Sequence, residues 1–176
     1  VQTYNGRHYD GEESYGGYAK DIVVKEDFVL RVPENLDYAA AAPLLCAGVT
    51  VWSPLKHWKV GPGMKVAIMG LGGLGHMAVK FAAAMGAETY VLGHSPNKAQ
   101  DAKDMGATEY LITSESFESH KDTFDVILNT VSADIELDSL LDMLKVGGTL
   151  IYVGVSGNKQ SFHPFSLITG LKSIAG

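Results

Sequence analysis

Short apolar runs alternate with helix-like segments along the second half of the chain. The runs are almost continuously apolar, which is typical of parallel strands buried on both faces. We expect six strands there. They are KVAIMG (65–70), ETYVLG (88–93), TEYLIT (108–113), FDVILNT (124–130), GTLIYVGV (148–155) and KSIAG (172–176).

Between these strands, apolar residues recur at the three- and four-residue spacing of amphipathic helices. The segments are 72–86, 95–106 and 134–148, and Gly86, Gly106 and Gly147 stand where helix C-caps are expected. Because strand–helix–strand crossovers are right-handed, the alternation predicts an α/β fold, a doubly wound six-stranded parallel (Rossmann) sheet with order 3-2-1-4-5-6.

The amino end has a different pattern. Residues 16–32 are rich in β-branched and aromatic residues with partial alternation, which predicts short antiparallel strands. From residue 33 the chain changes to alanine- and leucine-rich helix formers. We therefore expect a short β-rich domain remnant at residues 1–36 and a second domain at 37–176.

Composition narrows the functional classes. The 176 residues are 46% apolar and carry a net charge of −6 without a basic run, which argues against a nucleic-acid partner. Because no uncharged apolar stretch of about 18 residues occurs, we expect no membrane partner and a cytoplasmic protein. Cys46 is the single cysteine, so no internal disulfide is possible. The first residues contain no initiator methionine, and we expect the sequence to be a fragment.

The segment AIMGLGGLGH (67–76) contains the strongest motif. Gly70, Gly72 and Gly75 form a G-x-G-x-x-G pattern between the first expected strand and its helix. In that position the first glycine permits a tight turn, the second lets backbone approach a pyrophosphate, and the third lets helix and strand pack closely. We predict dinucleotide binding by residues 70–75, namely Gly70, Leu71, Gly72, Gly73, Leu74 and Gly75; the alternative is a turn without a ligand.

The end of the second strand indicates which dinucleotide binds. NAD-binding sites of this kind place Asp or Glu there to bind the ribose hydroxyls, but this chain has His94, Ser95 and Lys98. A hydroxyl and an ammonium at a helix start suit the 2′-phosphate of NADP. Ser95 before Pro96 is also a good helix N-cap, and both roles are compatible. We predict NADP as the cofactor.

Several sequence segments together resemble a known family. GGYAKDIVV, PENLDYAAAAPLLCAGVTVWSPLK, the glycine segment and LKVGGTLIYVGV resemble the zinc-dependent medium-chain alcohol dehydrogenases, in particular their NADP-dependent cinnamyl alcohol dehydrogenase branch. The resemblance covers practically the whole chain. It implies that residues 1–36 end a GroES-like catalytic domain and that the protein is an enzyme interconverting primary alcohols and aldehydes.

The resemblance also implies site residues. Cys46 corresponds to a zinc ligand of the intact enzyme, and zinc would polarise the substrate oxygen. From the residues alone, a lone cysteine in an alanine- and leucine-rich stretch is more often a small buried hydrophobe than a metal ligand, and it is the resemblance that favours the ligand. Thr50, one turn later, matches a position that reaches the nicotinamide, or it packs inside its helix. At two strand ends the family contacts the cofactor mainly through backbone, at positions Asn129, Thr130, Val131, Val153, Gly154 and Val155.

The sequence departs from the family in lacking the GHE-type segment and the four-cysteine lobe. Cys46 alone cannot assemble a zinc site, so we expect the chain to be inactive by itself. Two alternatives remain: a zinc-free quinone oxidoreductase of the same superfamily, and a nucleotide-binding module without chemistry. A zinc-free quinone oxidoreductase would have no use for Cys46.

The last expected strand predicts an assembly. An apolar edge strand at 171–175 presents unpaired backbone groups, which proteins usually cover or pair. The resembling family joins such edges across a two-fold axis, so we expect a homodimer through this strand.

Overall fold

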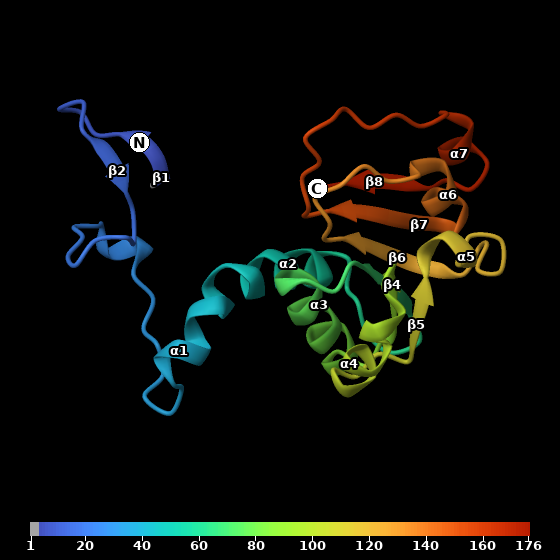
Figure 1. The fold of residues 1–176 in the computed structure, drawn as a ribbon, viewed down its shortest axis with the longest axis horizontal. Helices are drawn as coiled ribbons and strands as arrows, with labels where there is room; N and C mark the ends of the chain where they lie inside the picture. Colours follow the sequence, from blue (N-terminus) through green and yellow to red (C-terminus); the bar gives the residue numbers. More distant parts are fainter. Residues whose placement is uncertain (1–3) are drawn as a thin grey trace. The chain divides into compact units, whose positions relative to one another are not determined.

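The computed structural model describes residues 4–176, which divide into two compact units. The units are Val1–Tyr38 and Ala39–Gly176, and each is described by itself. The division lies within two residues of the boundary expected from composition. Figure 1 shows the elements of both units along the chain.

The first unit contains one small antiparallel sheet. Strands β1 (Tyr4–Arg7) and β2 (Glu13–Tyr15) pair through a turn in which the His8 amide donates to the Glu12 carbonyl over 2.8 Å. The expectation of strands within residues 16–32 was wrong, since the structure has only a 3-10 turn there, η1 (Glu26–Phe28).

The physical reason lies in what these residues pack against. Ile22, Val23, Val24, Val29 and Leu30 are all exposed. A high β-propensity produces a strand only where a neighbour supplies backbone hydrogen bonds and a face to pack against. Within the described first unit, residues 16–32 have no such partner strand.

The second unit begins within the first of three helical segments. They are α1 (Tyr38–Ala41), η2 (Ala42–Leu45) and α2 (Ala47–His57). Among the described residues no single helix is long and apolar enough to cross a membrane; Tyr38–Leu45 and Ala47–His57 reach that length and composition only as a pair bent by 51°. In α2, Val51 and Leu55 are completely buried in the core of the unit.

A six-stranded parallel sheet with order β5-β4-β3-β6-β7-β8 organises the rest, which confirms the predicted topology. The strands are β3 (Lys65–Met69), β4 (Glu88–Gly93), β5 (Glu109–Ile112), β6 (Phe124–Asn129), β7 (Leu144–Tyr152) and β8 (Ser173–Ala175). The connecting elements are α3 (Gly73–Ala84), η3 (Pro96–Lys98), α4 (Ala99–Asp104), α5 (Thr113–Ser116), α6 (Leu137–Asp142) and α7 (Phe165–Ile168).

Alternate residues of the strands build two separate cores. In β3, Val66 and Ile68 pack with α2, α3 and α4, whereas Ala67 belongs to the core that contains α6. All three side chains are completely buried. Side chains of a strand point alternately to opposite faces, so the sheet is covered on both sides, as near-continuous apolar strands predict.

The helix expected at 134–148 is shorter than its pattern suggests. Leu144 begins β7 instead of extending α6, because the Met143 carbonyl accepts the Thr123 and Phe124 amides at 2.9 and 3.0 Å. The chain is therefore bonded to the neighbouring strand at this point. Gly147 has φ +77° inside β7 and is not a helix C-cap, whereas Gly86 and Gly106 follow helices with positive φ as predicted.

Two carboxylates hold the connection between β7 and β8. Asp134 accepts hydrogen bonds from Ser156, Asn158 and Gln160 at 2.5, 2.9 and 3.0 Å, and Asp138 accepts the Ser166 hydroxyl at 2.6 Å. These donors hold the pKa of both carboxyls below their usual value. Folding favours the ionised form of these carboxyls. Their hydrogen bonds therefore stabilise the fold at pH values above the ordinary pKa, and this stabilisation is lost as the pH falls through the lowered pKa.

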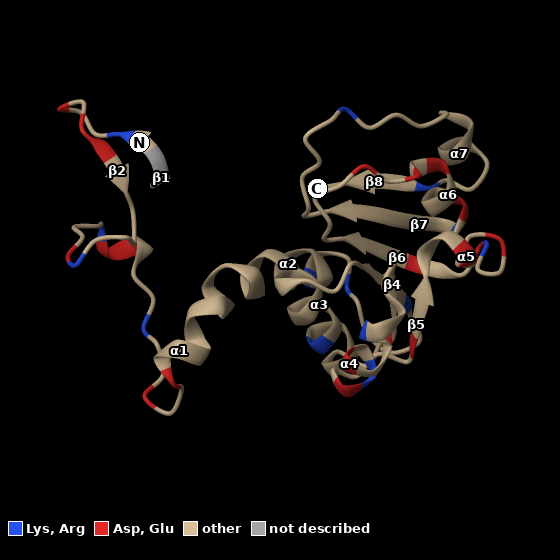
Figure 2. Cartoon of the chain, viewed as in Figure 1, with Lys and Arg blue, Asp and Glu red and all other residues tan. Residues whose placement is uncertain are grey.

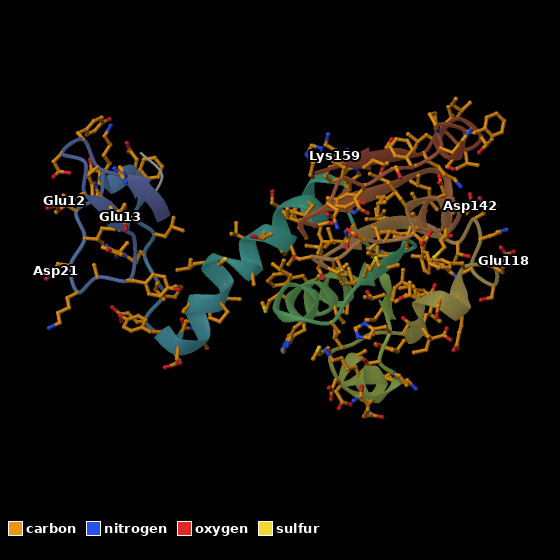
Figure 3. The ribbon with its side chains drawn as sticks, turned by 45° about the horizontal axis from the view of Figure 1, so that its top comes forward. Glu12, Glu13, Asp21, Glu118, Asp142 and Lys159 are labelled. Carbon is orange, nitrogen blue, oxygen red and sulfur yellow. The ribbon has the colours of Figure 1, made fainter. Side chains whose placement is uncertain are left out.

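Charged side chains are distributed over the outside of the second unit. Figure 2 shows Lys and Arg scattered over the ribbon rather than gathered along one element. In Figure 3 the side chains of Glu118, Asp142 and Lys159 extend outward from their ribbon. Lys159 belongs to the connection that Asp134 holds, so this segment is tethered on one side and solvated on the other.

Candidate functional site

The site forms where the parallel strands end at their carboxyl edge. In open α/β sheets this is where ligands bind, at the point where strand order reverses. Here the reversal lies between β3 and β6, because the chain runs outward from β3 through β4 to β5 and then returns to β6. The glycine turn follows β3 directly.

The glycines of the turn have three different environments. Gly70 has φ +90°, and a Cβ there would lie 2.4 Å from Val131 Cγ1. Gly75 lies so close to the preceding turn that a Cβ would be 2.1 Å from the Gly70 carbonyl oxygen. A Cβ at Gly72 or Gly73 would meet nothing within 4 Å. The protein's own packing therefore explains Gly70 and Gly75 but not the two exposed glycines between them.

The open space at Gly72 and Gly73 lies at the start of α3. Gly72 is the N-cap residue, its carbonyl accepts the His76 amide at 2.8 Å, and no side chain caps the helix. The first amides of a helix lack intrahelical acceptors and carry partial positive charge. α3 is 12 residues long, so its start, with backbone reachable from solvent, suits a phosphate group.

The exit of β4 brings Lys98 to the glycine turn. Lys98 Nζ donates to the Leu71 carbonyl at 3.2 Å, although the two residues are 27 positions apart. An ammonium has three N–H donors, so this contact leaves donors for an anion. His94 and Lys98 are exposed and Ser95 is half-buried, and the Ser95 hydroxyl makes no capping bond. Of the three predicted residues, Lys98 thus has a contact to the glycine turn.

The ends of β6 and β7 form the adjoining wall. The Thr130 hydroxyl donates to the Met69 carbonyl at 2.7 Å, and the buried Asn129 side chain accepts the Val131 amide at 3.0 Å. A Cβ on Gly154 would lie 2.2 Å from the Val131 carbonyl oxygen. Asn129 and Thr130 side chains therefore shape the backbone of this wall rather than pointing free donors outward.

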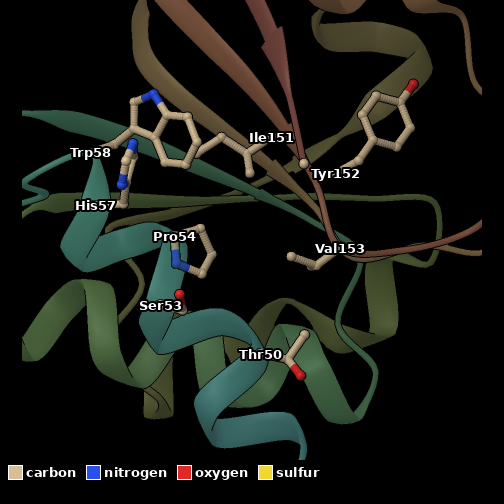
Figure 4. A pocket seen from close by; sticks show the side chains of 9 residues that line it. Thr50, Ser53, Pro54, His57, Trp58, Ile151, Tyr152 and Val153 are labelled. Atoms are coloured by element: carbon tan, nitrogen blue, oxygen red, sulfur yellow. The ribbon is translucent and has the colours of Figure 1, made fainter. Parts of the chain in front are cut away.

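A hollow of about 460 Å³ separates α2 from the end of β7. Figure 4 shows Thr50 and Pro54 on one side and Val153 on the other, with the Tyr152 ring turned away. The full lining is Thr50, Ser53, Pro54, His57, Trp58, Ile151, Tyr152, Val153 and Gly176. Thr50 and Val153, which sequence reasoning proposed separately, thus share one hollow.

Cys46 and Val155 are not among the residues that line this hollow. Cys46 is exposed at the N-cap of α2, one turn before Thr50, and Val155 is 79% exposed. Interpreting Cys46 as a buried hydrophobe is excluded by its exposure. Among residues 4–176, no group of three His, Cys, Asp or Glu side chains could hold a metal ion, so the described residues do not by themselves fit a zinc centre.

The sequence patterns did not mark Tyr110, His57 or Trp58 as site residues. Tyr110 Oη donates to the Ser95 carbonyl at 2.8 Å, and His57 and Trp58 line the hollow. Burial raises the pKa of the Tyr110 phenol, a group that is protonated at neutral pH even at its ordinary pKa. No sequence motif marks a contact between neighbouring strands, and only the strand order brings Tyr110 to this place.

Comparison with known proteins identifies the family. A family model described as zinc-binding dehydrogenase matches residues 73–176. The chain belongs to this family. It is 54% identical over its whole length to a probable formaldehyde dehydrogenase, AdhA, from Bacillus subtilis, and covers 51% of that protein. It is 48% identical to NADP-dependent alcohol dehydrogenase C 1 from Mycolicibacterium smegmatis, again over 100% of this chain and 51% of the relative.

Solved structures extend the match. A cinnamyl alcohol dehydrogenase from Sorghum bicolor superposes with a TM-score of 0.92 at 41% identity, over 98% of this chain and 50% of that chain. The resemblance to alcohol dehydrogenases is therefore confirmed, as is the Rossmann-type fold. This chain spans about half the length of the curated relatives it matches.

The three glycine environments predict separable effects of substitution. Gly72→Val should unfold within a few degrees of the parent but lose NADPH binding, because the side chain fills the space open to the ligand. Gly75→Ala should destabilise the fold by about 1–3 kcal/mol, because its Cβ cannot coexist with the Gly70 carbonyl. Thermal unfolding and calorimetric titration separate the two. If Gly72→Val binds NADPH with unchanged affinity, the glycine turn has only a structural role.

Proposed function

We propose that the chain is the NADP(H)-binding part of an alcohol dehydrogenase that interconverts primary alcohols and aldehydes. The observation that carries this is the placement of Lys98 against the glycine turn, with open space at Gly72. The relative from Mycolicibacterium smegmatis is named as NADP-dependent, which supports the same cofactor. When bound, the nicotinamide would accept a hydride from the alcohol or donate one to the aldehyde.

The chain's own residues have distinct roles in this proposal. The start of α3 binds the pyrophosphate through backbone amides, since Gly72 and Gly73 leave the approach clear. Lys98 and Ser95 bind the 2′-phosphate. Thr50 and Val153 both line the hollow and orient the nicotinamide end.

We extend the proposal to a cinnamyl-type substrate and to catalytic zinc. The support for the substrate is the 41% identity to the Sorghum bicolor enzyme. For zinc, the support is the family description together with the exposed thiol of Cys46, since thiolates are suitable zinc ligands. In this proposal Cys46 supplies one ligand, and the other ligands come from outside these 176 residues.

We also propose a homodimer through the β8 edge. β8 pairs with β7 on one side and has no strand partner on the other among the described residues. The neighbouring Phe165, Ile168 and Leu171 are 61%, 68% and 78% exposed. Association of two such edges would pair their backbone groups and bury these side chains in a self-complementary contact.

Cofactor choice is tested at Lys98. Lys98→Ala should weaken NADPH binding by about ten- to a hundredfold, the value of a charge-assisted hydrogen bond, and leave NADH binding nearly unchanged. Titration calorimetry measures both, with Lys103→Ala, an exposed lysine in the next helix, as the control. Equal losses for NADPH and NADH would contradict the assignment.

The zinc proposal predicts the metal content of the chain. The 176-residue polypeptide should hold well below one zinc per molecule, because Cys46 is the only ligand proposed within it. Atomic absorption on the purified chain, with Cys46→Ser beside it, gives the answer. One tightly held zinc per chain in both proteins would show that other residues form the site.

The dimer proposal is tested at Leu171. This leucine has φ +50° and is largely exposed, a conformation that asparagine tolerates better. Leu171→Asn should therefore leave the fold at least as stable while shifting the chain toward monomer. Light scattering measures the mass, and a monodisperse monomer of the unmodified chain at micromolar concentration refutes the dimer.

A further inference from the structure

Tyr110 crosses the end of the neighbouring strand. Its backbone pairs with Val91 in β4, but its side chain reaches past Gly93, and its hydroxyl donates to the Ser95 carbonyl at 2.8 Å. The ring packs against the core on the α3 and α4 side of the sheet. A side chain of β5 thus contacts the turn that leaves β4.

Gly93 makes room for this crossing. A Cβ on Gly93 would lie 2.0 Å from the Tyr110 hydroxyl oxygen and 2.6 Å from Cζ. The φ of Gly93 is outside the left-handed region, so backbone conformation does not require glycine at this strand end. The space occupied by the Tyr110 phenol does require it.

The Ser95 carbonyl has a second donor. It accepts the Lys98 amide at 3.1 Å and so closes the 3-10 turn η3. The same turn directs Lys98 Nζ to the Leu71 carbonyl at 3.2 Å. A displacement of the Ser95 carbonyl would therefore move both the Ser95 hydroxyl and the Lys98 ammonium relative to the glycine turn.

We propose that Tyr110 is a positioning residue for cofactor specificity. Its hydroxyl holds the Ser95–Lys98 turn in the position in which the turn binds a 2′-phosphate. This inference rests on the proposed function, in which Ser95 and Lys98 bind that phosphate. Tyr110 itself does not touch the phosphate; it acts through the carbonyl that organises the turn.

The test compares two adenosine nucleotides that differ only in the 2′-phosphate. Calorimetry measures adenosine 2′,5′-bisphosphate and adenosine 5′-monophosphate binding to the parent chain and to Tyr110→Phe, which keeps the ring and removes the hydroxyl. Affinity for the bisphosphate should fall about three- to tenfold, the effect of one neutral hydrogen bond. Affinity for the monophosphate should change by less than about twofold.

Two further variants make the result specific. Gly93→Ala keeps the Tyr110 hydroxyl but displaces it, so it should show the same selective loss. The Thr113 hydroxyl donates a different hydrogen bond at this strand end, to the Gly93 carbonyl at 3.2 Å. Thr113→Val removes that bond and should leave the ratio of bisphosphate affinity to monophosphate affinity unchanged. Thermal unfolding of each variant establishes that it is folded under the titration conditions.

The outcomes separate this inference from the function on which it rests. If Lys98→Ala loses bisphosphate selectively and Tyr110→Phe does not, the positioning role is overturned while the proposed function stands. Equal weakening of both nucleotides in Tyr110→Phe, or the same ratio change in Thr113→Val, also overturns it. If the parent does not prefer the bisphosphate and Lys98→Ala has no effect, the proposed function fails together with the inference.

Discussion

The close approach of Gly75 to the Gly70 carbonyl is the constraint on which the site depends. Without room for a Cβ between them, α3 must start directly beside the end of β3. Its amides then lie at the carboxyl edge of the sheet, where the strand order reverses between β3 and β6. The proposed phosphate position depends on this placement, and the contact of Lys98 with Leu71 lies in the same turn.

A second constraint comes from the buried polar groups at the same edge. Asn129 and Thr130 use their side chains on nearby backbone atoms, because unpaired polar groups are costly in a buried position. The result is a fixed wall with little side-chain freedom. A cofactor placed there would meet preorganised backbone and would need less ordering of the protein on binding.

Periodicity predicted the second unit well, because two-sided burial leaves a strong apolar signal in every strand. The same reasoning failed at residues 16–32, where β-branched residues have no partner strand in the described unit and remain exposed. It also extended the helix before β7 too far, since Leu144 fits a helical stripe and a strand equally well. The Met143 carbonyl, bonded to Thr123 and Phe124, decides between them. For the site, local motifs located the glycines, while Tyr110 depends on which strands are neighbours.

The alternation of β3 between two cores has an evolutionary consequence. Inserting or deleting one residue within β3 would exchange the positions of Val66, Ala67 and Ile68 between the faces. The small Ala67 would then leave a cavity on one face, and the larger Val66 and Ile68 would clash with their new neighbours on the other. β3 is also hydrogen-bonded on both edges, so neither neighbour can absorb the slip. Insertions and deletions in homologous chains should therefore accumulate in surface loops, and β3 should keep a constant number of residues.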